Sequence, residues 1–272
     1  MSRAAEQIER LIAILEKLRS PTGCPWDRVQ DIRSLRPYLI EEAYEVLEQM
    51  DAVAEGAPMP GLCEELGDLL FQIAFHAQIA RERGEFDLGD VVQAICDKIE
   101  HRHPHVFSQG TAKDSREVAA CWAKLKAEER RRKTGSPGSA LDGVPRELAA
   151  LQRAERLTEK ASRVHFDWKR IEDVRAKVDE ELAELDAAIA QADRVEIERE
   201  LGDVLFALAN LGRWLRAPAE DALRGTVERF VARFHFIEEK LRARGCEPHE
   251  SSLEEMDALW NEAKQSLRGS RK

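Results

Sequence analysis

The stretch of sequence that decides the fold is Glu65-Leu66-Gly67-Asp68-Leu69-Leu70-Phe71, because it occurs again as Glu200-Leu201-Gly202-Asp203-Val204-Leu205-Phe206. The two copies differ only in their fifth residue. An acidic segment lies upstream of each copy, Glu41-Glu42-Ala43-Tyr44-Glu45 in the first case and Glu180-Glu181-Leu182-Ala183-Glu184 in the second. Near-identity at two places in the same order indicates an internal repeat. We therefore predict a duplicated domain.

Further landmarks extend the repeat in both directions. Basic and aromatic residues recur four positions apart in each half: Lys98 and Arg102 with Trp122 and Lys126 in the first, Arg229 and Arg233 with Trp260 and Lys264 in the second. Pro25-Trp26-Asp27 precedes the first copy, and Phe166-Asp167-Trp168 precedes the second. The predicted organisation is a first repeat over residues 1–129, a linker over 130–145 and a second repeat over 146–272.

The composition predicts an all-α protein rather than a mixed fold. The chain has 272 residues, 43% of them hydrophobic and 35% charged, with only 6% aromatic residues. Long amphipathic segments follow one another, with apolar residues at intervals of three and four, and no segment alternates as a strand would. The length allows two domains with cores of their own.

Charge and cysteine content exclude several classes of function. The net charge of −10 argues against a nucleic-acid-binding protein, although a metal can still attract a small polyanion to a local site. Five scattered cysteines without a CxxC pair indicate neither a disulfide framework nor a zinc ribbon. Neither a signal peptide nor an apolar run of membrane length is apparent, so we expect a cytoplasmic protein that does not bind membranes.

The second repeat places two acidic pairs on successive predicted helices. The helix over 172–192 has a predicted buried stripe of Val174, Val178, Leu182, Leu185 and Ile189, and the helix over 195–216 has an apolar face of Leu201, Val204, Leu205 and Leu208. Glu181 and Glu184 flank the first stripe, and Glu200 and Asp203 flank the second, three residues apart in each case. If the helices pack antiparallel, the four carboxylates converge.

Four converging carboxylates repel one another unless a cation neutralises them. Because all four ligands are oxygens, the sequence favours a hard cation, Mg²⁺, with Mn²⁺ as a substitute. The first repeat offers the same set in Glu42, Glu45, Glu65 and Asp68. The alternative interpretation is that each acidic pair is simply a solvated helix face, but the recurrence of both pairs in both halves argues for a metal site.

The basic and aromatic landmarks suit a phosphate chain and a base. Arg229 and Arg233 lie one turn apart, so both guanidinium groups can bind phosphate oxygens. Trp260 can stack on a base while Lys264 reaches a phosphate, although Trp260 also fits a core position among neighbouring apolar residues. In the first repeat the corresponding group consists of Lys98, Arg102, Trp122 and Lys126.

Together, these segments resemble the MazG-type nucleoside triphosphate pyrophosphohydrolases in their two-repeat bacterial form. The resemblance covers nearly the whole chain. It rests on Gly23-Cys24-Pro25-Trp26-Asp27, the acidic segments, the repeated Glu-Leu-Gly-Asp stretch, Arg102-His103-Pro104-His105-Val106-Phe107 and Phe166-Asp167-Trp168. It implies a duplicated all-α domain with four-helix-bundle cores, assembled as a homodimer, that cleaves nucleoside triphosphates to monophosphates and diphosphate with Mg²⁺.

The resemblance also assigns roles by position. It places the metal carboxylates at Glu181, Glu184, Glu200 and Asp203, and the nucleotide contacts at Lys177, Glu180, Arg229, Arg233, Trp260 and Lys264. The family often has lysine where this chain has Arg229. Tyr38 stands where the second repeat has Lys177, so the first repeat lacks one phosphate-binding cation. We therefore expect the second repeat to be the principal active site.

Several alternatives remain open at the level of sequence. Either Glu180 or one of the four carboxylates can act as the general base that activates water. A helical scaffold that senses nucleotides or docks a regulatory protein without turnover would carry the same acids, and so would a house-cleaning enzyme specific for a modified or deoxy nucleotide. His101, His103 and His105 alternate along the chain and resemble a metal cluster, but without acidic partners at ligand spacing they indicate a structural loop rather than a zinc site. Base and sugar preference, the activity of each repeat and completion of the sites across the dimer are not determined by the sequence.

Overall fold

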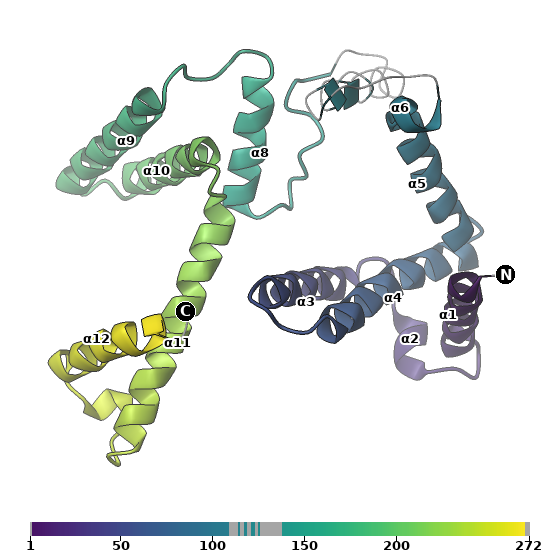
Figure 1. The fold of residues 1–272 in the computed structure, drawn as a ribbon, viewed down its shortest axis with the longest axis horizontal. Coiled ribbons are helices and arrows are strands. Elements are labelled where there is room, and N and C mark those ends of the chain that lie inside the picture. Colours follow the sequence, from purple (N-terminus) through teal and green to yellow (C-terminus); the bar gives the residue numbers. More distant parts are fainter. Residues whose placement is uncertain are drawn as a thin grey trace. The chain divides into compact units, whose positions relative to one another are not determined.

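The computed structural model describes residues 2–108, 114, 117–118, 121–122, 125 and 138–269, with side chains described as far as residue 266. The chain divides into two compact units, Met1–Glu129 and Arg130–Lys272. The predicted linker over 130–145 begins outside the described residues, so its boundaries remain a prediction. Every regular element in the described part is a helix, which confirms the all-α prediction (Figure 1).

The N-terminal unit is built around an antiparallel helical hairpin. Its helices are α1 (Arg3–Arg19), α2 (Pro25–Val29), α3 (Arg36–Ala54), α4 (Pro60–Glu82), α5 (Leu88–Arg102) and α6 (Pro104–Phe107). Helices α3 and α4 pack side by side, and α1 covers one side of α4 (Figure 1). Leu15 of α1, Leu35 and Phe75 of α4 form the centre of the core, each 1% exposed.

The C-terminal unit repeats the hairpin and adds a long helix. Its elements are α8 (Ala150–Ser162), α9 (Ile171–Gln191), α10 (Arg194–Leu215), α11 (Ala219–Arg242), the short 3₁₀ helix η1 (Pro248–Glu250) and α12 (Leu253–Gly269). Asp193 caps α10 by accepting hydrogen bonds from the N–H groups of Val195 and Glu196. The hairpin of α9 and α10 is therefore closed by the two residues Ala192 and Asp193, and α8 packs against α10.

The two hairpins end differently. The last turn of α9 is closed by Ala192 and that of α10 by Arg216, both in the left-handed conformation, with φ of 53° and 56°. In the N-terminal unit the chain leaves α3 and α4 through Gly56 and Gly84, with φ of 104° and 70°. Left-handed backbone suits glycine but strains residues that carry a Cβ.

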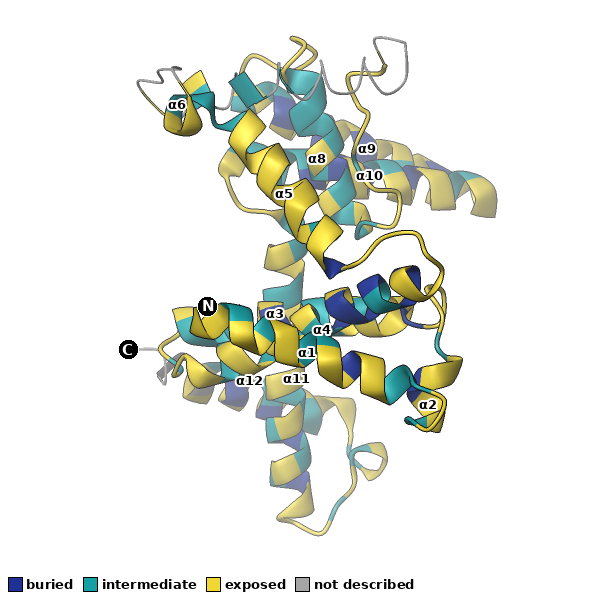
Figure 2. Ribbon diagram, turned by 90° about the vertical axis from the view of Figure 1, so that its right-hand side faces the viewer, coloured by how far each residue is buried: buried dark blue, intermediate teal, exposed yellow. Residues whose placement is uncertain are grey.

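The predicted buried stripes are only half correct. Val174 and Val178 are buried on α9 and Val204 is buried on α10, whereas five of the other predicted positions are at least 42% exposed: Leu182, Ile189, Leu201, Leu205 and Leu208. The reason is that α8 covers one side of the hairpin and no described part of the chain covers the other. The same holds for α5, which is exposed along most of its length (Figure 2). The exposed leucines form a long apolar face on the C-terminal hairpin.

Candidate active site

Three carboxylates converge between the two helices of the C-terminal hairpin. Glu181 and Glu184 lie one turn apart on α9, and Glu200 faces them from α10, with one oxygen of each within 4.8 Å of the others. Glu181 and Glu200 are only 7% and 5% exposed, whereas Glu184 is exposed. Thus three of the four predicted metal ligands form a compact group at the centre of the hairpin, which we call the C-terminal cluster.

The fourth predicted ligand, Asp203, lies beside this cluster and not within it. Its carboxylate oxygen is 3.5 Å from a guanidinium nitrogen of Arg199, and its side chain is about half exposed. Asp203 nevertheless lines the same cavity as Glu181 and Lys177. Because Asp203 follows Glu200 by one helical turn, both residues are presented on one side of α10.

Two cations balance part of the negative charge. Lys177 Nζ lies 2.7 Å from a carboxylate oxygen of Glu180 and 2.8 Å from one of Glu181. Hydrogen bonds to Glu180 and Glu181 raise the pKa of Lys177 well above its usual range. Arg199 forms ion pairs with Glu196, Glu200 and Asp203. Lys177 was predicted from the sequence and Arg199 was not, although the acids three residues before Arg199 and one and four residues after it were a visible signal.

The described side chains do not fully compensate the negative charge of the C-terminal cluster. Glu200 Oε2 is buried and has no hydrogen-bond partner among the described residues. Partial loss of solvent raises the pKa of the Glu184 carboxyl, and the nearby charges of Glu181 and Glu200 raise it further. A buried carboxylate oxygen without a donor is costly, and carboxylate oxygens are the ligands that hard divalent cations prefer. The arrangement therefore fits a divalent cation.

A cavity of about 620 Å³ opens beside the cluster. Its walls come from α8, α9, α10 and the segments around α8: Leu141, Leu157, Thr158, Ala161, His165, Phe166, Asp167, Trp168, Lys177, Glu181, Asp203, Phe206, Ala207 and Asn210. Most of this surface is apolar. Phe166 and Trp168 are 81% and 46% exposed. The aromatic landmark found in the sequence thus lines a cavity that adjoins the carboxylates.

A hydrogen-bonded network holds the wall of this cavity in place. One oxygen of Asp167 accepts hydrogen bonds from Arg213 at 2.7 Å, from the indole N–H of Trp214 at 3.2 Å and from the backbone N–H of Trp168 at 2.9 Å. Burial opposes ionisation of Asp167, but the hydrogen bonds from Arg213 and Trp214 outweigh it and lower the pKa of its carboxyl. Arg213 also donates to Asn210. Asn210, Arg213 and Trp214 were not predicted from the sequence, because nothing in their spacing distinguishes them from core and surface positions of a helix.

The remaining predicted nucleotide contacts lie elsewhere in the unit, on α11 and α12. Trp260 packs against Phe230, with ring centres 5.3 Å apart, and the guanidinium of Arg233 lies 5.3 Å from the centre of its ring. Arg229 donates to Thr226, and Lys264 donates to Asn261. None of these four predicted residues lines the cavity or pairs with the C-terminal cluster within one chain, since α12 packs on the half of α11 that lies away from α9 and α10 (Figure 1).

The N-terminal hairpin repeats the acidic group. Glu42, Glu45 and Glu65 bring one oxygen each within 4.8 Å of one another, and Asp68 is again outside this group. Loss of solvent raises the pKa of Glu42 and of Glu65, and neighbouring carboxylates raise both further. Where the C-terminal unit has Lys177, the N-terminal unit has Tyr38, which packs against Trp26 in an edge-to-face arrangement with ring centres 5.7 Å apart. This N-terminal cluster therefore lacks the cation that flanks the C-terminal one.

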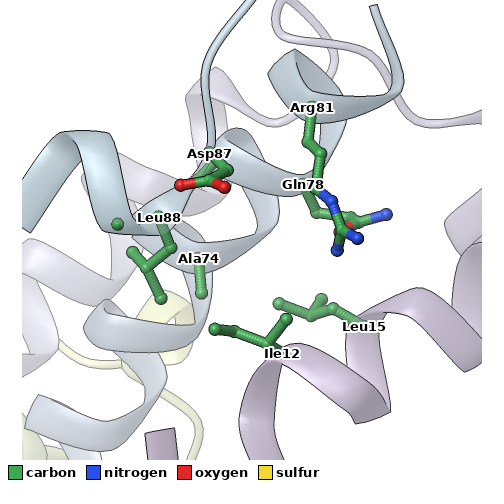
Figure 3. A pocket seen from close by; sticks show the side chains of 9 residues that line it. Ile12, Leu15, Ala74, Gln78, Arg81, Asp87 and Leu88 are labelled. Carbon is green, nitrogen blue, oxygen red and sulfur yellow. The ribbon is translucent and has the colours of Figure 1, made fainter. Parts of the chain in front are cut away.

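The other candidates in the N-terminal unit are not gathered around its acids. Lys98 and Arg102 lie on α5, and Trp122 packs against His103, with ring centres 4.9 Å apart. Lys126 lies outside the described residues. A pocket of about 230 Å³ between α1, α4 and the start of α5 is lined by Leu15, Gln78, Arg81 and Asp87 among others, and it excludes the acidic cluster (Figure 3).

Similarity to known proteins agrees with the repeat. The profile of the MazG nucleotide pyrophosphohydrolase domain matches residues 30–107 and 170–235. The chain is 45% identical over 261 residues to a nucleoside triphosphate pyrophosphohydrolase of Escherichia coli (strain K12), which covers 95% of this chain and 97% of the relative. It is 42% identical over 264 residues to the nucleoside triphosphate pyrophosphohydrolase/pyrophosphatase MazG of Thermotoga maritima, covering 97% and 98%. A nucleoside triphosphate pyrophosphohydrolase of Mycobacterium tuberculosis matches 60% of the chain at 37% identity.

Proposed function

Because the chain belongs to the MazG family of nucleotide pyrophosphohydrolases, we propose that its C-terminal cluster cleaves nucleoside triphosphates into monophosphates and diphosphate with the help of Mg²⁺. The chain is a nucleoside triphosphate pyrophosphohydrolase, a hydrolase that acts on acid anhydrides. The assignment to particular residues is supported chiefly by one observation. Two nearly buried glutamates and a third carboxylate converge beside a cavity, and one buried oxygen has no donor among the residues that the structure describes.

The cation would be held by Glu181, Glu184 and Glu200, with Asp203 beside them. When bound, Mg²⁺ supplies positive charge that neutralises the triphosphate and stabilises charge developing at the attacked phosphorus. Lys177, which lines the same cavity, would pair with a phosphate oxygen as a point charge. A carboxylate of this group, or Glu180, accepts the proton of the attacking water. Hydrolysis adds water across the broken anhydride bond, so water is the nucleophile and no covalent intermediate on a side chain is invoked.

A homodimer accounts for the exposed apolar face of the C-terminal hairpin. Leu182, Ile189, Leu201, Leu205 and Leu208 would be buried if a second copy packed its own hairpin against this face, which completes a four-helix bundle. The family membership implies the same assembly. Light scattering should give the mass of two chains, and Leu201→Glu with Leu205→Glu should shift the protein to monomers.

Product analysis tests the function directly. Incubation of the full chain with a nucleoside triphosphate and Mg²⁺ should release monophosphate and diphosphate in equal amounts, and removal of metal with a chelator should abolish release. Glu200→Gln and Asp203→Asn should each lower kcat/KM by roughly 100-fold, because each removes a negative charge that attracts the cation. Unchanged rates in both variants would contradict the assignment of the site.

The rival function is a nucleotide-sensing scaffold without turnover. It shares the acids and the cavity but predicts nucleotide affinity with no monophosphate or diphosphate formed. The membership in a family of pyrophosphohydrolases favours the enzyme.

The described helices include none that is long and apolar enough to cross a lipid bilayer.

A further inference from the structure

The cavity beside the C-terminal cluster has the dimensions and surface of a site for a flat ring. Its volume of about 620 Å³ falls within the range of small-ligand sites. Trp168 and Phe206 contribute aromatic surface, and Leu157 and Ala207 contribute aliphatic surface. Lys177, Glu181 and Asp203 lie in the same lining. A nucleotide whose phosphates meet these charged groups would therefore have its base within reach of the apolar walls.

One polar side chain in this lining, Asn210, has a fixed orientation. Its Oδ1 accepts hydrogen bonds from Arg213 Nε at 3.0 Å and from a terminal nitrogen of Arg213 at 2.8 Å. A guanidinium donates hydrogen bonds and cannot accept them, so the amide oxygen must face Arg213. The amide nitrogen of Asn210 therefore turns away from Arg213, and it donates to no other described residue.

The orientation of Asn210 is stabilised by the contacts that hold Arg213 in place. Arg213 is held by Asp167 at 2.7 Å, and both side chains of this ion pair are at least 79% buried. Asp167 is tied in turn to the backbone N–H of Trp168 and to the indole of Trp214. Rotation of the Asn210 amide would place two N–H groups of Arg213 against an N–H₂ group, which is unfavourable. Asn210 therefore presents a donor and has no acceptor to offer the cavity.

We propose that this cavity binds the nucleobase and that Asn210, locked by Arg213 as a hydrogen-bond donor, selects bases with an exocyclic oxygen over bases with an exocyclic amino group. The inference rests on the proposed function of the C-terminal cluster. A donor pairs with the carbonyl oxygen at position 6 of hypoxanthine or guanine and at position 4 of uracil. It cannot pair with the amino group at those positions in adenine or cytosine.

The N-terminal unit has a different kind of side chain at the position that corresponds to Asn210. The repeat aligns Asn210 with Phe75, which is 1% exposed and packs in the core with Leu15 and Leu35. Ala207 corresponds to Gln72, a larger and buried side chain. Two positions that line the cavity beside the C-terminal cluster thus carry buried side chains in the other repeat. The donor at position 210 is a feature of the C-terminal unit alone among the described residues.

Matched pairs of substrates test the proposal. Steady-state hydrolysis by the full chain with Mg²⁺ is measured for ITP against ATP and for UTP against CTP, since the members of each pair differ at the exocyclic position and its ring neighbour. The wild type should favour ITP and UTP by roughly tenfold in kcat/KM, as expected for one hydrogen bond gained against one donor left unpaired. Asn210→Ala should bring both ratios close to one, and Asn210→Asp, which offers only acceptors, should reverse them.

Controls separate this inference from the proposed function and from misfolding. Gln191→Glu makes the same amide-to-carboxylate change at an exposed position ten residues beyond Glu181 and should leave both ratios as in the wild type. If the Asn210 variants fail to fold, as judged by circular dichroism, the wild type decides: quenching of its tryptophan fluorescence should show tighter binding of inosine than of adenosine. If the protein hydrolyses nucleotides but the Asn210 substitutions leave both substrate ratios unchanged, only the role of Asn210 in base selection is overturned. Equal binding of the two nucleosides would overturn it as well, and no hydrolysis by the wild type would overturn the proposed function.

Discussion

At the position of Asn210 in the C-terminal unit, the N-terminal unit has Phe75, and the two residues have opposite surroundings. Asn210 lies on the wall of an open cavity, whereas Phe75 is packed inside a core and is 1% exposed. The acidic groups nearby are almost the same in both units. The comparison teaches that similar acids do not make two equivalent sites, because the side chains beside the acids differ.

The flanking cations differ as well. Lys177 pairs with Glu180 and Glu181 in the C-terminal unit, while Tyr38 packs against Trp26 in the N-terminal unit. Arg199, which pairs with Glu200, corresponds to Glu64 in the other repeat. Two positive charges are therefore replaced by an aromatic ring and a further negative charge. The N-terminal cluster can attract a cation, but it is less suited to a polyanionic substrate.

The largest expected effect concerns the filled core. Phe75→Ala should lower the free energy of unfolding of the N-terminal unit by about 3–5 kcal/mol, because it leaves a cavity among Leu15 and Leu35. Asn210→Ala should lower stability by only about 1 kcal/mol, since it removes hydrogen bonds at the edge of an existing cavity. Urea denaturation followed by circular dichroism measures both. Similar losses for the two variants would show that the units are packed alike at this position.

The next effect concerns the two acidic clusters. Glu181→Gln should lower kcat/KM for nucleoside triphosphates by about 100-fold, because Glu181 is buried within the C-terminal cluster and borders the cavity. Glu42→Gln, the corresponding change in the N-terminal cluster, should lower it by less than about tenfold. A diphosphate-release assay on both variants provides the comparison. If Glu42→Gln had the larger effect, the principal site would be in the N-terminal unit.

A smaller effect is expected at the flanking cation. Lys177→Met should raise KM by about tenfold, as expected for the loss of one charged hydrogen bond to a phosphate oxygen, with a smaller change in kcat. Tyr38→Phe in the N-terminal unit keeps the ring that packs against Trp26 and should leave KM unchanged. Initial rates over a range of substrate concentrations separate the two parameters. A wild-type KM in Lys177→Met would exclude Lys177 from substrate binding.

The smallest effect is a dependence of stability on pH. The pKa of Glu184 is raised above its ordinary value of 4.5, so the folded protein holds this proton to a higher pH than the unfolded chain does. Stability contributed at this residue therefore falls as the pH rises from 4.5 through the raised pKa. Without metal, Glu184→Gln should lose this dependence and melt at a slightly higher temperature than the wild type above that range. Thermal melts of both proteins at several pH values measure it, and added Mg²⁺ should remove the difference by stabilising the wild type.

The fold was largely predictable because its determinants are local. Periodic apolar residues located the helices to within a few residues, as for the helix predicted over 172–192 and found at Ile171–Gln191. The repeated acidic pairs also predicted which carboxylates approach one another. Residues three apart on one helix lie on the same side of it, and two antiparallel helices bring such sides together. Glu181, Glu184 and Glu200 converge as expected, although Asp203 is drawn toward Arg199.

What the sequence could not predict depends on which side of each helix is covered. The apolar stripe of α9 was expected to be buried, but Leu182 and Ile189 are exposed because the described part of the chain provides a neighbour on one side only. The positions of Arg229, Arg233, Trp260 and Lys264 relative to the acids depend on where the long helix α11 leads, and spacing along the chain contains no such information. The orientation of the Asn210 amide depends on Arg213 and Asp167, a contact across 46 residues.

The left-handed residues that close α9 and α10 offer an opportunity for protein engineering. Ala192 and Arg216 hold a conformation that the N-terminal unit assigns to glycine. Glycine at either position would relieve backbone strain of about 1 kcal/mol, offset in part by the greater entropy of the unfolded chain. Both positions lie at the ends of the hairpin and remote from its acids, so a more heat-resistant catalyst is accessible through two changes that leave its chemistry untouched.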